Sequence, residues 1–150
     1  MKFRIAIFLV FTSYVLISCG GQTNKTNDPI VYAKSGDPEL EKAKLDALSN
    51  LDYFIKSFQS NSNDTIFEYY VKMDFIDNGE HEHMWLFVSK YVNDAFFGFL
   101  ANEPEIVKNV KNGQPLEVTK DLIEDWVILD SRTGKKEGDY SSKVLLNQEN

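Results

Sequence analysis

The sequence predicts an α+β fold, in which one N-terminal amphipathic helix packs on a curved antiparallel sheet of five to six short strands. Apolar residues recur at spacings of three and four between Leu40 and Phe58, and they alternate with polar residues from Phe67 to Phe75. Short apolar runs separated by turn residues follow. Strong curvature would let so few strands enclose their aromatic side chains, so we expect the sheet to be barrel-like.

The helix is predicted to begin at Asp37-Pro38-Glu39. Asp37 can cap the free amide groups, and Pro38 fits the first helical position. The apolar stripe occupies one side and the charged residues lie mostly on the other, so we expect the stripe to cover the sheet. The alternative interpretation is a helix that binds a partner. The polar residues 59–64 should end the helix.

The predicted strands are short runs rich in apolar and β-branched residues, each bounded by turn residues. They cover residues 67–75, 82–91, 96–100, 115–118 and 126–129. The first three make an antiparallel meander, because Asp77-Asn78-Gly79 and Asn93-Asp94 are turn signals. A single helical turn is predicted near Thr119 and another over 106–110. For residues 140–146 the periodicity leaves strand and short helix open.

Residues 1–18 have the pattern of a secretory signal peptide. Lys2 and Arg4 form a positive start, and an apolar run of thirteen residues extends from Ile5 to Ile17. Spanning a bilayer takes roughly 20 apolar residues, so this run is too short for a transmembrane anchor. We therefore expect residues 1–18 to be cleaved.

Cys19 is the only cysteine of the chain and stands directly after the predicted cut. Leu16-Ile17-Ser18-Cys19 resembles the lipobox of bacterial lipoproteins, in which the cysteine thiol is acylated and becomes the new N-terminus. The resemblance implies that Cys19 is the lipid attachment site, with acyl chains such as palmitate holding the protein to a membrane. A signal peptide with a chance cysteine is the alternative. Gly20 and Gly21 favour a cell-envelope lipoprotein on the outer membrane, facing the periplasm.

Residues 19–36 are polar and predict a flexible tether to a single domain over residues 37–150. Loss of the signal peptide leaves 14 basic against 23 acidic residues, a net charge of −9. This charge argues against nucleic acid, which needs a basic surface, and against electrostatic docking on anionic lipid. With Cys19 acylated, the domain has no thiol for a disulfide, a nucleophile or a metal site.

Several motifs resemble those of one bacterial family. They are, in chain order, Glu82-His83-Met84-Trp85-Leu86, Leu100-Ala101-Asn102-Glu103-Pro104, and Asp125-Trp126. Residues 138–145 form a variant of a closing Gly-Gly-Tyr-Thr-x-Arg-x-Leu segment, with Asp139, Ser141 and Lys143 as departures. Together these motifs resemble DUF2314, whose members are sometimes called YegJ-like. The resemblance covers residues 39–146 and implies no established activity.

The sequence contains no Gly-x-Ser-x-Gly, phosphate-loop or HExxH motif. It therefore favours a non-catalytic binding module without a cofactor, which meets an unknown envelope protein or ligand. The candidate binding residues lie in the family motifs. They are Glu82, His83, Trp85, Asn102, Glu103, Asp125 and Trp126.

Two alternatives involve other chemistry. Glu82, His83 and Asp125 could support hydrolysis, because burial raises the pKa of a carboxyl group and histidine titrates near neutrality. His81 and His83 share one face of a strand and could bind a metal ion such as zinc together with a distant carboxylate. We favour the simpler interpretation, in which His81 is an exposed turn residue and His83 is a structural hydrogen-bonding residue.

The aromatic residues suggest a further possibility for binding. Trp85, Trp126 and the run Phe96-Phe97-Gly98-Phe99 could line a peptide or glycan groove. Most are expected in the core, because a small domain needs them there. An outward-facing Phe96 or Tyr70 would be the exception that marks a binding surface.

Overall fold

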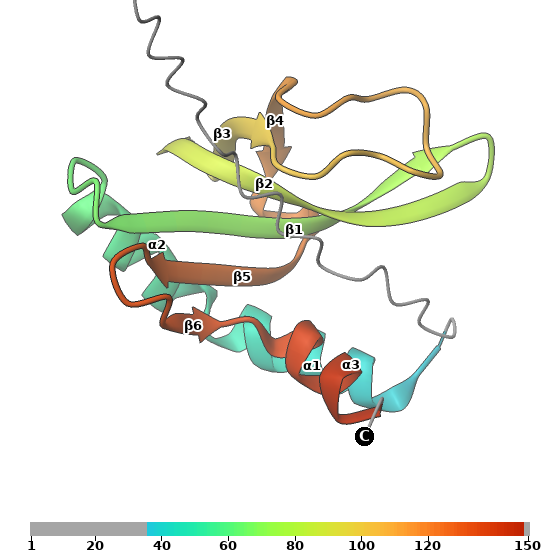
Figure 1. The fold of residues 1–150 in the computed structure, drawn as a ribbon, viewed down its shortest axis with the longest axis horizontal. Helices are drawn as coiled ribbons and strands as arrows, with labels where there is room; N and C mark the ends of the chain where they lie inside the picture. The colour runs from blue at the N-terminus through green and yellow to red at the C-terminus, as the bar shows by residue number, and fades with distance from the viewer. Residues whose placement is uncertain (1–35, 149–150) are drawn as a thin grey trace, which may run out of the picture. The chain divides into compact units, whose positions relative to one another are not determined.

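The computed structural model describes residues 36–148, so the predicted signal peptide, Cys19 and nearly all of the predicted tether lie outside the described residues. Figure 1 shows the arrangement of helices and strands. In chain order the elements are α1 (Pro38–Ser49), α2 (Leu51–Asn61), β1 (Phe67–Asp77), β2 (Glu80–Val92), β3 (Ala95–Leu100), β4 (Pro115–Thr119), the 3-10 helix η1 (Lys120–Leu122), β5 (Ile123–Asp130), β6 (Lys136–Gly138) and α3 (Tyr140–Gln148). None of the helices in the described part of the chain is long and apolar enough to span a membrane.

The α+β class and the antiparallel sheet are confirmed. The sheet has six strands in the order β4-β3-β2-β1-β5-β6. It is not closed, so the expected barrel is wrong. Closure requires hydrogen bonding of every strand on both sides. The edge strand β6 has only three residues, and α3 begins at Tyr140, directly after Asp139.

The single predicted helix is in fact two helices that meet at Asn50. As predicted, Asp37 Oδ1 accepts a hydrogen bond from the Glu39 amide (2.8 Å) and Pro38 opens α1. The Asn50 side chain donates to the Asp46 carbonyl at 2.8 Å, and its backbone has φ −108° and ψ 7°. This local hydrogen bond competes with the helical ladder and ends α1.

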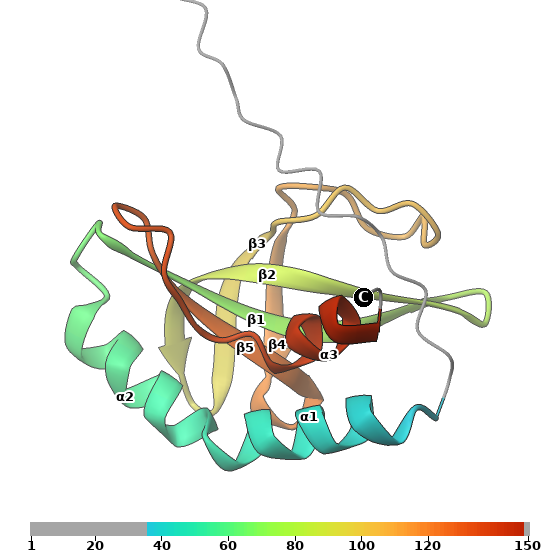
Figure 2. The ribbon, with the colours of Figure 1, turned by 60° about the horizontal axis from the view of Figure 1, so that its bottom comes forward.

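The helices α1 and α2 lie on the same side of the sheet (Figure 2). We call this side the inner face and the opposite side the outer face. The Phe54 ring of α2 contacts the rings of Tyr69 and Trp126, with centroid distances of 5.6 and 5.5 Å. The Trp126 indole N–H donates to the Ala47 carbonyl of α1 at 2.8 Å. The main core is therefore formed between these helices and the inner face.

The loop 101–114 covers the other end of the inner face. A second apolar cluster of Phe75, Met84, Leu100 and Val107 lies beneath it. The helical turn expected over 106–110 is wrong, because this stretch contains only bends. Its conformation is set by long-range hydrogen bonds from the sheet, which local sequence does not reveal.

Residues 140–146, for which the sequence pattern allowed either a strand or a short helix, are part of α3. The buried carboxylate of Asp125 holds the start of this helix. It accepts hydrogen bonds from the backbone N–H groups of Trp126 (2.8 Å), Tyr140 (3.2 Å) and Ser141 (2.8 Å), and from the Ser141 hydroxyl (2.7 Å). Asp125 thus satisfies the free amides of a helix N-terminus from a neighbouring strand.

The Asp125→Ala variant tests this role. We expect its free energy of unfolding to fall by about 2–3 kcal/mol, because buried donors lose a charged acceptor. Urea denaturation followed by tryptophan fluorescence measures the change. The exposed Asp121→Ala should stay within about 0.5 kcal/mol of the wild type. Equal stability of both variants would contradict the role of Asp125.

Candidate functional site

A row of aromatic residues crosses the outer face of the sheet. Phe99 of β3 lies opposite Phe87 of β2, and Phe87 lies opposite Tyr70 of β1. The rings of Tyr70 and Phe87 meet edge to face with centroids 5.5 Å apart. Phe87 is 36% exposed and Phe99 is 47% exposed. We call Tyr70, Phe87 and Phe99 the aromatic row, and exposed apolar clusters of this kind mark interaction sites.

Trp85 lies beside the aromatic row and is half-buried. The Lys72 ammonium lies 5.5 Å from the Trp85 ring centroid and donates to the Ser141 hydroxyl at 3.2 Å. Burial lowers the pKa of Lys72, and the nearby carboxylates of Asp125 and Glu124 oppose this shift. Trp85 therefore extends the aromatic surface next to a partly desolvated cation.

Each histidine of β2 pairs with its own carboxylate. His81 Nδ1 lies 2.6 Å from Asp74 Oδ2, and His83 Nδ1 lies 2.6 Å from Glu124 Oε2. Lys44 of α1 donates to the other oxygen of Glu124 at 2.9 Å. Residues 36–148 contain no group of three or more His, Cys, Asp or Glu side chains arranged to hold a metal ion.

The ion pair between His83 and Glu124 shifts the pKa of each group in the direction that favours its charged form. The hydrogen bond to Glu124 raises the pKa of His83 above its usual 6.5, although burial opposes this. Burial favours the neutral acid of Glu124, but the hydrogen bonds from His83 and Lys44 outweigh it and bring the pKa of Glu124 to about 2. Both groups are therefore charged over a wide pH range.

Glu82 has its partners on the inner face. Its carboxylate accepts hydrogen bonds from the backbone N–H groups of Glu105 (2.9 Å), Ile106 (2.9 Å) and Val107 (3.0 Å). Burial would raise the pKa of Glu82, but these three donors outweigh it and lower the pKa. Glu82 thus fixes the loop over the second apolar cluster.

The three residues of the hydrolysis hypothesis are not brought together. Adjacent residues of a strand point to opposite faces, so Glu82 and His83 lie on different sides of β2. Asp125 is 1% exposed and caps α3. The described residues therefore place no shared acid–base centre at Glu82, His83 and Asp125.

The remaining candidates have varied surroundings. Asn102 Oδ1 accepts a hydrogen bond from the Trp85 backbone N–H at 2.7 Å, and Glu103 is exposed on the same loop. Trp126 is 2% exposed within the main core. A binding role for all seven candidate residues stays a prediction, since several of them already have structural partners.

Sequence reasoning missed Phe87 of the aromatic row, and it named Phe99 only as part of the run 96–99, without separating the outward-facing ring from the buried one. Tyr70 and Phe96 are the two aromatic residues whose outward orientation would mark a binding surface. Tyr70 faces outward, and Phe96 is fully buried. The signal was available for Phe87, because the two-residue period of a strand places it on the same face as Trp85. For Phe99 the signal was its spacing of three from Phe96, which puts the two rings on opposite faces.

The described part of the chain is thus an open antiparallel sheet with one face covered by two helices and a loop and the other bearing exposed aromatic residues. The family model described as "Uncharacterized protein conserved in bacteria (DUF2314)" matches residues 37–149, and the chain belongs to this family. It is 32% identical over 123 residues to "Uncharacterized protein YegJ" of Escherichia coli (strain K12), covering 82% of this chain and 77% of the relative. No solved structure matches the chain.

The structure explains why the closing family motif tolerates two of its departures, Asp139 and Ser141. Gly138 has φ +79°, and a Cβ atom there would lie 2.2 Å from the Trp126 carbonyl oxygen, so only glycine fits. Asp139, where a second glycine was expected, has φ +57°, a conformation that aspartate adopts more readily than most residues. Ser141 keeps the hydroxyl that a threonine would offer to Asp125. The motif therefore serves to dock α3.

The pairing of His83 with Glu124 predicts a pH dependence. A raised folded pKa means that protonated His83 stabilises the fold fully below its usual pKa of 6.5, and this contribution is lost as pH rises through the folded value. Glu124 contributes above its usual 4.5, and its contribution is lost as pH falls toward about 2. NMR titration of the His83 ring should give a pKa above 6.5 that falls in Glu124→Gln. An unchanged pKa in the variant would contradict the pairing.

Proposed function

We propose that the protein is a non-catalytic binding module, held at the bacterial cell envelope by lipid on Cys19, that engages an envelope protein or ligand through its outer face. The observation that carries this proposal is the exposed aromatic row. The solvated face of an antiparallel sheet is usually polar. Here three aromatic residues lie opposite one another on adjacent strands of that face instead.

The arrangement of the aromatic row suits recognition better than stability. Phe99 is 47% exposed to solvent, whereas Phe96, three residues earlier on the same strand, is completely buried. Aromatic side chains bring large apolar area to an interface with little loss of rotamer freedom. A partner that covers the row would remove this apolar surface from water.

The placement of the polar candidates supports a module without catalysis. Glu82 holds a loop, His83 is paired with Glu124, and Asp125 caps a helix. These groups are satisfied by the protein itself and do not converge on a shared cavity. The small-hydrolase and metal-binding alternatives therefore gain no support from the geometry.

Membrane attachment follows from the N-terminal sequence. Acylation of Cys19 would place the lipid eighteen residues before Asp37, the cap of α1. A coil of the predicted tether's length would span about 23 Å on average, from roughly 5–6 Å times the square root of residue number. Such a tether would keep the domain within reach of an envelope partner.

Photocrosslinking in the bacterial host tests the proposal. The full chain carries benzoylphenylalanine at Phe99, or at Leu122 as a control of similar exposure, 47% against 52%. We expect a discrete adduct in the membrane fraction from position 99 only. Cys19→Ala should remove both membrane recovery and the adduct, because the domain would no longer be held near its partner.

Two results would contradict the proposal. Adducts of the same size and yield from positions 99 and 122 would show that the aromatic row has no special contact. Membrane recovery that persists in Cys19→Ala would show that acylation of this cysteine is not the anchor.

A further inference from the structure

A cavity of about 370 Å³ opens where β1 and β2 part. The two strands pair as far as Tyr70 and Phe87. Before Tyr70, β1 pairs only with β5, and beyond Phe87, β2 pairs only with β3 through a bulge between Val88 and Lys90. Bulges bend a strand and increase its twist, so the strands diverge at this point. The volume falls within the range of small-ligand pockets.

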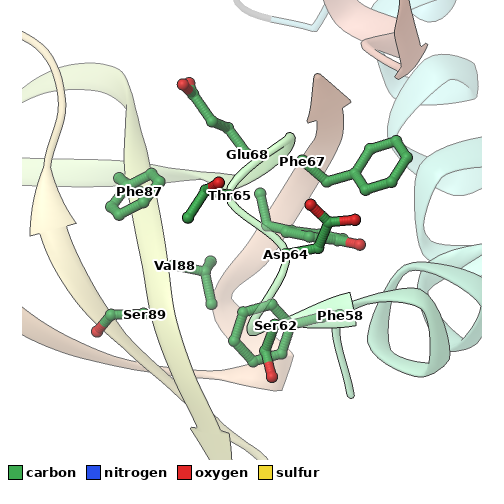
Figure 3. Close-up of a pocket in the computed structure, with 10 residues that line it drawn as sticks. Phe58, Ser62, Asp64, Thr65, Phe67, Glu68, Phe87, Val88 and Ser89 are labelled. Atoms are coloured by element: carbon green, nitrogen blue, oxygen red, sulfur yellow. The ribbon is translucent and has the colours of Figure 1, made fainter. Parts of the chain in front are cut away.

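The apolar part of the cavity's lining reaches from the outer face to α2. Figure 3 shows that the lining residues come from the end of α2 and the loop after it, the start of β1 and the middle of β2. Phe58 of α2 and Tyr69 of β1 are 6% and 3% exposed. The Tyr69 hydroxyl is already bonded to Ser57, so the Tyr69 ring offers mainly its apolar surface. Phe87 of the aromatic row lines the opposite side.

The charged residues that line the cavity are all acidic. Asp64 and Glu68 are present, and the lining includes no lysine, arginine or histidine. Asp64 Oδ1 accepts a hydrogen bond from the Ile66 amide at 3.0 Å, and Glu68 Oε2 accepts one from the Tyr70 hydroxyl at 2.6 Å. Among residues 36–148, neither carboxylate forms an ion pair. Lys90, next to the lining residue Ser89, lies instead over the Phe97 ring at 5.4 Å.

We propose that this cavity binds the lysine or arginine side chain of a basic peptide segment. The apolar stem would lie against Phe58 and Phe87, and the cationic end would meet Asp64 and Glu68. Long basic side chains combine an apolar stem with a charged head, and aromatic rings attract cations. The inference rests on the proposed function, because the cavity shares Phe87 with the aromatic row.

An NMR titration tests the inference on the full chain, labelled with ¹⁵N and held in detergent micelles. The probes are the capped tripeptides acetyl-Ala-Lys-Ala-amide and acetyl-Ala-Arg-Ala-amide. The matched control replaces the basic residue with norleucine, which keeps an apolar stem and removes the charge. We expect saturable shifts of amides in residues 62–68 and 87–89 with the basic peptides, and much weaker ones with the control.

The double variant Asp64→Asn with Glu68→Gln should weaken binding of the basic peptides about fivefold, since each partly exposed charge pair contributes modestly. Both substitutions retain a side-chain oxygen, now an amide carbonyl, that can accept the existing hydrogen bond, so the melting temperature should change little. Asp121→Asn, a distant exposed carboxylate, should leave the affinity unchanged.

Several results would overturn the inference. Amide shifts of equal size with the norleucine peptide would show that the charge is not recognised, and shifts with N-acetylglucosamine but not with the basic peptides would indicate a glycan site. An affinity for the basic peptides that is unaffected by the double variant, or no amide shifts in residues 62–68 and 87–89, would also contradict it. Because Phe99 does not line the cavity, crosslinking from that position can succeed while this titration fails. The two proposals can therefore fail separately.

Discussion

The two-residue period of β1 determines which residues of the sheet are buried and which are exposed. This strand pairs with β2 on one side and β5 on the other, so its pleat sets the facing of its neighbours. Val71 lies between Leu86 and Trp126 on the inner face, and the next residue, Lys72, lies between Trp85 and Asp125 on the outer face. A slip of one residue in this register would exchange the two faces.

Two carboxylates, Glu82 and the buried Asp125, attach further segments to the sheet. Glu82 fastens the loop 101–114 over one end of the inner face, and Asp125 fastens α3 at the edge of β5. Each accepts hydrogen bonds from several backbone N–H groups that have no partner within their own segment. The polar residues of the family motifs are thus used largely to attach covering segments. The aromatic row and the cavity beside it have no cover in the described part of the chain.

Local sequence signals predicted the elements whose structure depends on neighbouring residues, such as the cap at Asp37 and the five predicted strands. They did not predict the segments whose conformation depends on contacts with residues far away in the sequence. The loop near Val107 takes its conformation from Glu82, and Gly138 is required by its approach to Trp126. The three-residue strand β6 is too short to show a period. The candidate site was named from motifs, whereas the outward-facing aromatic rings emerge from cross-strand register.

The inner face supplies the stability of the domain, and the aromatic row on the outer face contributes little to it. Urea denaturation of Phe96→Ala and Phe99→Ala compares two rings of the same strand on opposite faces. We expect Phe96→Ala to cost about 3–5 kcal/mol, the usual range for a buried phenylalanine. Phe99→Ala should cost about 1 kcal/mol or less, since its ring is 47% exposed. Equal losses would contradict the account, because the outer face would then be part of the core.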